Sequence, residues 1–216
     1  MTHPAYTPAS SDSPARRPLS PDTERLDARA ARAWTEPMAV RPLGRGRYAV
    51  DSASGATYVV DLSASECSCP DHEIRGERCK HLRRVAIEVT ERRVPPPGRR
   101  LADCAVCRRP SFVPESTAIP VCDDCRLGRS DIATDRETGD TVVVYRMTDE
   151  TAAERYVEAA DCTVAEYPKN DGYPADAPVV EVVYPFSGDP DADIEDRPRY
   201  AFPRSRLAAR DEMLIE

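Results

Sequence analysis

Two groups of cysteine and histidine residues have the types and the spacing of metal ligands. The first group runs C-x-C, nine residues, C-x-H, and its members are Cys67, Cys69, Cys79 and His81. The second runs C-x2-C, fourteen residues, C-x2-C, and its members are Cys104, Cys107, Cys122 and Cys125. Three thiolates with one imidazole, or four thiolates, close a tetrahedron around zinc. The sequence therefore predicts two four-ligand sites and two zinc ions.

The alternative to metal binding is a cluster of disulfides or buried thiols. No apolar segment follows Met1, so nothing directs the chain to an oxidising compartment, and we expect a cytoplasmic protein in which clustered cysteines bind metal. Tetrahedral sulfur also suits iron, which leaves zinc or iron open at the four-cysteine site. Four protein ligands leave no open coordination position, so we expect neither metal to be catalytic.

The C-x-C…C-x-H order of the first group resembles the SWIM-type zinc finger, a family named for chromatin remodellers and Mutator-type transposases. The resemblance extends over about residues 40–94, which include the preceding hairpin and the following helix. It implies a small zinc-stabilised ββα finger. SWIM-type fingers are predicted to bind DNA or proteins, so the resemblance permits both kinds of partner without choosing between them.

Hydrophobic periodicity predicts how the finger positions these ligands. Two strands are expected at 47–50 and 57–62, and a helix at 80–89. One face of that helix is apolar and would pack on the hairpin: Leu82, Val85, Ala86 and Val89. Its other side carries three cations: Lys80, Arg83 and Arg84. We interpret these cations as the candidate nucleic-acid or partner-binding residues, the alternative being that they neutralise a metal site of net negative charge.

Composition divides the chain into four parts and predicts an α+β fold class. Residues 1–20 are rich in Pro, Ser and Ala and are expected to be a disordered tail. Residues 21–94 are expected to hold a helix and the finger, and a proline-rich break separates them from a zinc-ribbon-like four-cysteine module at 95–130. Residues 131–216 are expected to form an acidic α+β module of no assigned family.

Within this last module the pattern predicts one helix among short strands. The strands are expected at 141–145, 162–167, 179–184 and 200–202, and the helix at 149–160. The second and third strands would form a hairpin, and the acidic run Asp189–Asp196 would be a solvated loop without a calcium site. Three single residues are expected to have structural rather than functional roles: Trp34 as a helix anchor, His72 as an exposed loop histidine and Cys162 as a buried core thiol.

Charged residues are unevenly distributed along the chain, and the composition is unusual. The chain has 30 basic and 38 acidic residues, and the acid gathers at 130–216, where the net charge is −12. Only two of the basic residues are lysines, Lys80 and Lys169, and this composition looks haloarchaeal, typical of a salt-adapted cytoplasm. No apolar run is long enough to cross a bilayer.

No catalytic motif is present, so we expect no enzyme and no small-molecule substrate. A transposase is disfavoured because nothing supplies its catalytic carboxylate domain. The sequence predicts a non-enzymatic zinc protein that binds nucleic acid, as a DNA-associated regulatory protein. The alternative is a protein-interaction adaptor that does not contact nucleic acid.

Overall fold

The N-terminal half of the chain is built on a four-stranded antiparallel sheet. The computed structural model describes residues 21–186 and 193–210, and in it β1 (Met38–Gly44), β2 (Arg47–Ser52), β3 (Thr57–Asp61) and β4 (Glu66–Cys67) pair in that order. The two expected strands correspond to β2 and β3 and are confirmed. The expected ββα unit is nevertheless too small, because β1 adds an edge strand to β2. Pro42 in β1 fits this position, since an edge strand tolerates a missing N–H donor.

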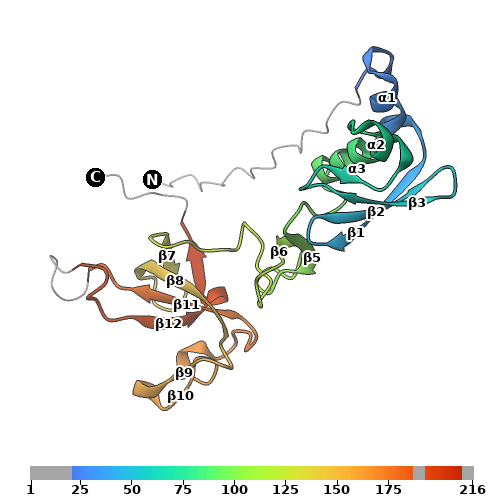
Figure 1. Ribbon diagram of the computed structural model, residues 1–216. Helices are drawn as coiled ribbons and strands as arrows, with labels where there is room; N and C mark the ends of the chain where they lie inside the picture. Colours follow the sequence, from blue (N-terminus) through green and yellow to red (C-terminus); the bar gives the residue numbers. More distant parts are fainter. Residues whose placement is uncertain (1–20, 187–192, 211–216) are drawn as a thin grey trace, which may run out of the picture.

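Three helices gather on one side of this sheet (Figure 1). They are α1 (Ala28–Thr35), α2 (Pro70–Arg75) and α3 (Lys80–Thr90), and a 3₁₀ turn, η1 (Thr23–Arg25), precedes α1. The apolar face predicted for α3 is confirmed, because Leu82 and Val85 are buried against Tyr48 and Val60 of the sheet. Packing of this face, rather than helix propensity, supplies most of the stability of so short a helix.

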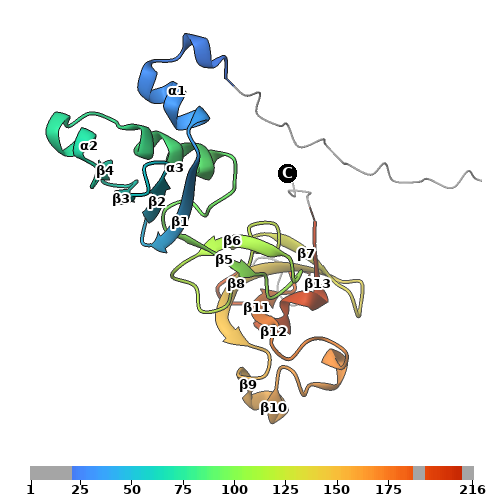
Figure 2. The ribbon, with the colours of Figure 1, turned by 90° about the vertical axis from the view of Figure 1, so that its right-hand side faces the viewer.

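The four-cysteine module lies between the finger and the C-terminal module in both views (Figures 1 and 2). Its framework is a hairpin of β5 (Arg99–Asp103) and β6 (Pro110–Pro114). Two hydrogen bonds join it and the preceding linker to the finger. The Tyr48 hydroxyl donates to the Pro95 carbonyl at 2.7 Å, and the Arg45 backbone N–H donates to the Glu115 carboxylate at 3.0 Å.

The C-terminal module is a five-stranded antiparallel sheet that curls on itself. Its strand order is β12-β11-β8-β7-β13, and the bounds are β7 (Ile132–Asp135), β8 (Thr141–Thr151), β11 (Pro178–Val183), β12 (Tyr200–Pro203) and β13 (Leu207–Ala209). The edge strands β12 and β13 are joined only by η4 (Arg204–Arg206), a 3₁₀ turn of three residues. In a flat five-stranded sheet the edges would be about 19 Å apart, which so short a turn does not span. The sheet therefore forms a small, partly closed barrel.

The expected helix at 149–160 is wrong. Thr151 ends β8 and pairs with Pro178 of β11, Ala152 is fully buried, and the rest of the segment forms β9 (Tyr156–Val157) and η2 (Glu158–Ala160). The helical pattern of this segment is a local preference, and long-range pairing of β8 with β11 overrides it.

The expected hairpin between 162–167 and 179–184 is also wrong. The first of these segments contains only β10 (Cys162–Thr163), which pairs with β9, and β11 pairs with β8 and β12 instead. A further 3₁₀ turn, η3 (Pro168–Asn170), follows β10. The last expected strand is confirmed as β12. The long excursion from β9 to η3 is thus an insertion between two neighbouring strands of the barrel.

The α+β fold class is confirmed, with short helices and several small sheets. The tail expected at 1–20, and residues 189–192 of the expected acidic loop, lie outside the described residues. Trp34 is partly buried on α1. Among the described residues, no helix has both the length and the apolar character needed to cross a membrane.

Candidate metal centres

The first ligand group converges on one point of the finger. Its four donor atoms lie within 4.8 Å of one another, and all four residues are buried. His81 Nδ1 lies 3.9 Å from Cys67 Sγ and 4.0 Å from Cys79 Sγ. These separations match a tetrahedral zinc site, in which ligand atoms lie roughly 3.6–3.8 Å apart around the ion. Cys67, Cys69 and Cys79 are all free thiols, so none of the three forms a disulfide.

Each ligand sits where a regular element begins or ends. Cys67 ends β4, Cys69 is the N-cap of α2, and Cys79 is the N-cap of α3. The sulfur atoms of both cap cysteines belong to the ligand cluster. His81 follows in the first turn of α3, and the ring of Tyr58 packs on its imidazole with centroids 4.6 Å apart. The tight C-x-C and C-x-H spacings thus translate into one strand end and two helix starts.

One thiol of this cluster, that of Cys79, loses its proton more readily than the other two. A hydrogen bond from Cys67, with further ones from His81 and the Leu82 backbone, lowers the pKa of Cys79 to about 3. The same bond to Cys79, together with burial, raises the pKa of Cys67. A buried thiolate next to neutral thiols is the starting point for metal binding, because the ion displaces the remaining protons.

The second group forms a separate four-sulfur cluster in the hairpin module. Its donor atoms also lie within 4.8 Å of one another, and Cys107 Sγ is 3.9 Å from Cys122 Sγ. Backbone N–H groups of Val106 and Cys122 donate to Cys104 Sγ, each at 3.4 Å. A hydrogen bond from the Arg109 backbone lowers the pKa of Cys107 to about 6. N–H donors around sulfur stabilise thiolates, so these residues fit a tetrahedral metal ion.

The C-terminal barrel supports this second cluster. Met147 of β8 packs against the cysteine cluster, and Leu127 is buried in the barrel core. The buried Arg204 donates through Nε to the Cys125 carbonyl at 2.7 Å. Burial lowers the pKa of Arg204. A cation beside four thiolates offsets the charge of about −2 that they carry with a divalent ion.

Two further residues with an expected structural role lie outside both clusters. His72 is partly buried on α2 rather than exposed in a loop, and its Nδ1 lies 2.8 Å from the Glu77 carbonyl. Cys162 is partly buried on β10 rather than fully buried in a core. Neither belongs to a group of potential metal ligands among the described residues.

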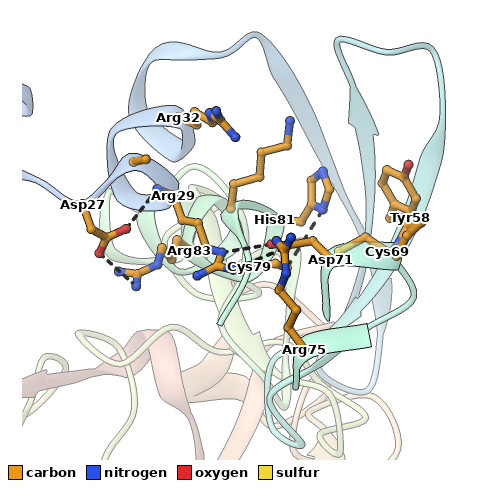
Figure 3. Close-up of a pocket in the computed structure, with 13 residues that line it drawn as sticks. Asp27, Arg29, Arg32, Tyr58, Cys69, Asp71, Arg75, Cys79, His81 and Arg83 are labelled. Carbon is orange, nitrogen blue, oxygen red and sulfur yellow. Dashed lines mark hydrogen bonds and ion pairs between the residues drawn. The ribbon is translucent and has the colours of Figure 1, made fainter. Parts of the chain in front are cut away.

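The three cations of α3 face α1 instead of open solvent. Arg83 pairs with Asp27 at 3.2 Å, and Lys80 pairs with Glu36. Arg84 pairs with Glu88 at 2.8 Å and donates to the Ala33 carbonyl of α1. Figure 3 shows Arg83 reaching Asp27 beside the metal ligands Cys79 and His81. No local sequence pattern indicates that α1 packs against these cations, because α1 precedes α3 by about fifty residues.

A cleft of about 560 Å³ lies between α1 and the first metal cluster. Its walls include Arg29, Arg32 and Arg75, along with Cys69 and His81 (Figure 3). Asp71 accepts hydrogen bonds from both Arg29 and Arg75. Helix α1 thus contributes one wall of this cleft, and the ligand cluster contributes another.

We expect the double variant Arg83→Ala/Arg84→Ala to loosen α1, since both side chains hold this helix on α3. The melting temperature should fall by a few degrees, and both metal ions should be retained. Trp34 on α1 is the only tryptophan of the chain, so a red shift of its emission reports the loss of packing. Arg25→Ala, on exposed η1, is the control and should leave the emission unchanged. An unchanged emission in the double variant would contradict the anchoring role.

Comparison with known proteins addresses the first metal centre. The family model described as SWIM zinc finger matches residues 58–89, a segment that begins in β3 and ends in α3 and contains the whole first ligand group. Searches of curated proteins and of solved structures gave no match. The match and the geometry agree on the same four ligands, Cys67, Cys69, Cys79 and His81. The chain therefore contains a SWIM zinc finger, with a second candidate zinc site beside it.

Proposed function

We propose that this chain is a non-enzymatic zinc protein that binds nucleic acid through exposed arginines of its SWIM finger. Zinc is proposed at both sites, because each offers four soft donors at tetrahedral spacing and no open position. A closed site has a structural role: it holds small modules together that have little apolar core of their own. Binding must then come from the surface that the metals organise.

One observation carries this proposal, the turn between β1 and β2. Gly44 and Gly46 both have positive φ angles, of 81° and 73°, and a side chain at Gly46 would come within 2.8 Å of Ser63 Oγ. The turn therefore requires glycine at these positions. The Glu115 carboxylate tethers the turn by accepting a hydrogen bond from the Arg45 N–H. The turn presents Arg45 and Arg47 as exposed side chains.

Neither of these two guanidinium groups forms an ion pair within the described part of the chain, although acidic residues outnumber basic ones. The neighbouring Arg41 of β1, by contrast, pairs with Asp51 at 3.4 Å. Arginine binds phosphate oxygens through two parallel N–H groups, and a fixed turn limits the conformational entropy lost on binding. Two unpaired guanidinium groups on a rigid turn suit the phosphate backbone of a nucleic acid.

The test is polynucleotide binding by fluorescence anisotropy, with labelled single-stranded DNA, duplex DNA and RNA over a range of salt concentrations. Arg45→Ala/Arg47→Ala should weaken binding and reduce the slope of log affinity against log salt by about 2, because each arginine that neutralises a phosphate contributes about 1 to that slope. Arg41→Ala, from the neighbouring strand β1, is the control and should leave the slope unchanged. Equal binding by the double variant and the unaltered protein would contradict the proposal.

A protein-interaction role is the second candidate function, and a different observation favours it. Ile74 on α2 is 81% exposed, and Val59 on β3 is 42% exposed. Exposed apolar side chains on a rigid metal-bound module are suited to a protein partner. In that case the unaltered chain should capture a protein partner even after nuclease treatment, and Ile74→Glu should abolish this capture. The same variant should leave the anisotropy measured with nucleic acid unchanged.

A further inference from the structure

A large cleft lies in the C-terminal barrel, away from both metal clusters. Its volume is about 1020 Å³, and its lining comes from β11 and β12 on one side and from the β9–η3 insertion on the other. This size lies at the upper end of the range of small-molecule sites. The insertion that the sequence pattern assigned to a helix therefore forms one wall of a potential binding site.

Aromatic rings gather in this cleft. Tyr156, Tyr167 and Tyr200 line it, and they are the only exposed tyrosines in the described part of the chain. Tyr184 and the largely buried Phe202 also contribute, and the rings of Tyr184 and Tyr200 meet edge to face with centroids 5.2 Å apart. Exposed tyrosine rings at the wall of a cleft provide faces on which another planar ring can stack.

Cations are also concentrated here, in the most acidic part of the chain. Residues 130–216 contain nine basic and twenty-one acidic residues, yet the cleft is lined by four of the basic and only two of the acidic residues. Two of the four basic residues are engaged with carboxylates: Arg155 pairs with Glu181, and Arg206 has a buried partner of its own.

The other two, Lys169 and Arg199, are exposed and form no ion pair among the described residues. Arg199 lies over the ring of Tyr145, with its central carbon 3.9 Å from the ring centroid, and donates to the Glu195 carbonyl at 3.4 Å. Carboxylates outnumber cations in this part of the chain, so these two cations are not unpaired for lack of acidic residues. They leave positive charge available to an anion at the cleft.

We propose that this cleft binds a nucleotide unit, with its base stacked on the tyrosine rings and its phosphate held by Lys169 and Arg199. The combination of planar faces and unpaired cations is the chemistry that a base and a phosphate require together. The site goes beyond the proposed function, because it uses none of the residues of the zinc finger. The acidic residues outside the cleft repel a long polyanion. Salt screens this repulsion beyond about 8 Å, so a single nucleotide held inside the cleft is repelled less than a long chain that extends over the acidic surface.

The test is isothermal titration calorimetry on the full-length, metal-loaded protein with adenosine 5′-monophosphate, adenosine, inorganic phosphate and a ten-residue oligodeoxyadenylate. The monophosphate is expected to bind at least about tenfold more tightly than adenosine or phosphate alone, because only it engages both halves of the site. Lys169→Ala should reduce monophosphate affinity toward that of adenosine. Tyr167→Ala should weaken monophosphate and adenosine alike, by at least about fivefold.

Both substitutions lie on or beside η3, at exposed positions, so neither removes a core side chain. Arg210→Ala is the matched control, an exposed cation after β13 that does not line the cleft, and should bind as the unaltered protein does. Melting temperatures identify any variant that has lost its fold, and Lys169→Ala keeps the test valid if the tyrosine variant does not fold.

The same experiment distinguishes whether the bound nucleotide unit belongs to a single-stranded nucleic acid or is a free nucleotide. Tighter binding of the oligonucleotide than of the monophosphate, measured in the Arg45→Ala/Arg47→Ala background, assigns the cleft to single-stranded nucleic acid, and equal binding assigns it to free nucleotides. That background keeps failure of the finger as a nucleic-acid surface distinct from failure of the cleft. The proposal is overturned if neither the monophosphate nor the oligonucleotide binds, or if phosphate alone binds as tightly as the monophosphate. It is also overturned if the Lys169→Ala and Tyr167→Ala variants both bind the monophosphate as tightly as the unaltered protein does.

Discussion

A Cys79→Ser variant is expected to bind one metal ion instead of the two proposed for the unaltered chain, and to lose the folded structure of residues 38–94. Cys79 is both a ligand and the N-cap of α3, and its sulfur lies at the centre of the finger core with Leu82 and Val85. Structural zinc contributes about 10–16 kcal/mol in finger peptides, which matches or exceeds the roughly 5–15 kcal/mol that stabilises a whole domain. Loss of one thiolate therefore removes the main source of stability.

Elemental analysis of protein purified without chelator gives the metal count, and circular dichroism with thermal melting reports the fold. Cys162→Ser is the matched control, because Cys162 is the one cysteine outside both clusters, and it should retain two ions and the melting behaviour of the unaltered protein. The C-terminal barrel should stay folded in Cys79→Ser, since its core shares no residue with that of the finger. Two ions in Cys79→Ser would contradict the ligand assignment.

The second large effect is expected from Asp135→Ala, which removes one half of a buried ion pair in the barrel. Arg206 of η4 bonds Asp135 of β7 through two nitrogens, at 2.7 and 2.5 Å, and the side chains are 2% and 0% exposed. Arg206 also donates to Asn170 Oδ1 at 2.8 Å and stacks over Phe202. Leaving a buried guanidinium unpaired costs about 3–5 kcal/mol, most of the stability of a small barrel.

Urea denaturation followed by circular dichroism should show a lower midpoint for the barrel transition in Asp135→Ala. Arg210→Ala, an exposed arginine after β13, is the control and should leave that midpoint within error. A shift of less than about 1 kcal/mol in the free energy of unfolding would show that the pair is solvated in solution.

The same pair predicts the direction of pH dependence. Burial raises the pKa of Asp135, but hydrogen bonds from Arg206 and the Glu137 backbone outweigh it, so the pKa of this carboxyl lies below its ordinary value. A lowered folded-state pKa means that the folded state holds the proton less tightly than the unfolded state. The stabilisation is therefore complete above the ordinary carboxyl pKa and is lost as the pH falls through the folded value. Asp135→Asn should show a weaker acid dependence.

The sequence by itself determined the two ligand sets, the α3 helix, the central hairpin of the finger and the α+β class. Ligands such as Cys67 and Cys69 are two residues apart, so their type and spacing already constrain the geometry of the site. The apolar spacing of Leu82 and Val85 likewise fixes a helix face locally. These features were predictable because residues close in sequence carry them.

Only the tertiary structure decided how distant residues meet. Asp27 and Arg83 bring α1 over the cations of α3, and Asp135 and Arg206, 71 positions apart, close the barrel. Pairing of β8 with β11 replaced the expected helix at 149–160 by a wall of the tyrosine-lined cleft. No local pattern predicts such pairings, because a charged or aromatic side chain shows no periodicity that identifies its partner. The sequence thus determined what binds metal, whereas long-range packing decided which cations and rings remain free to bind anything else.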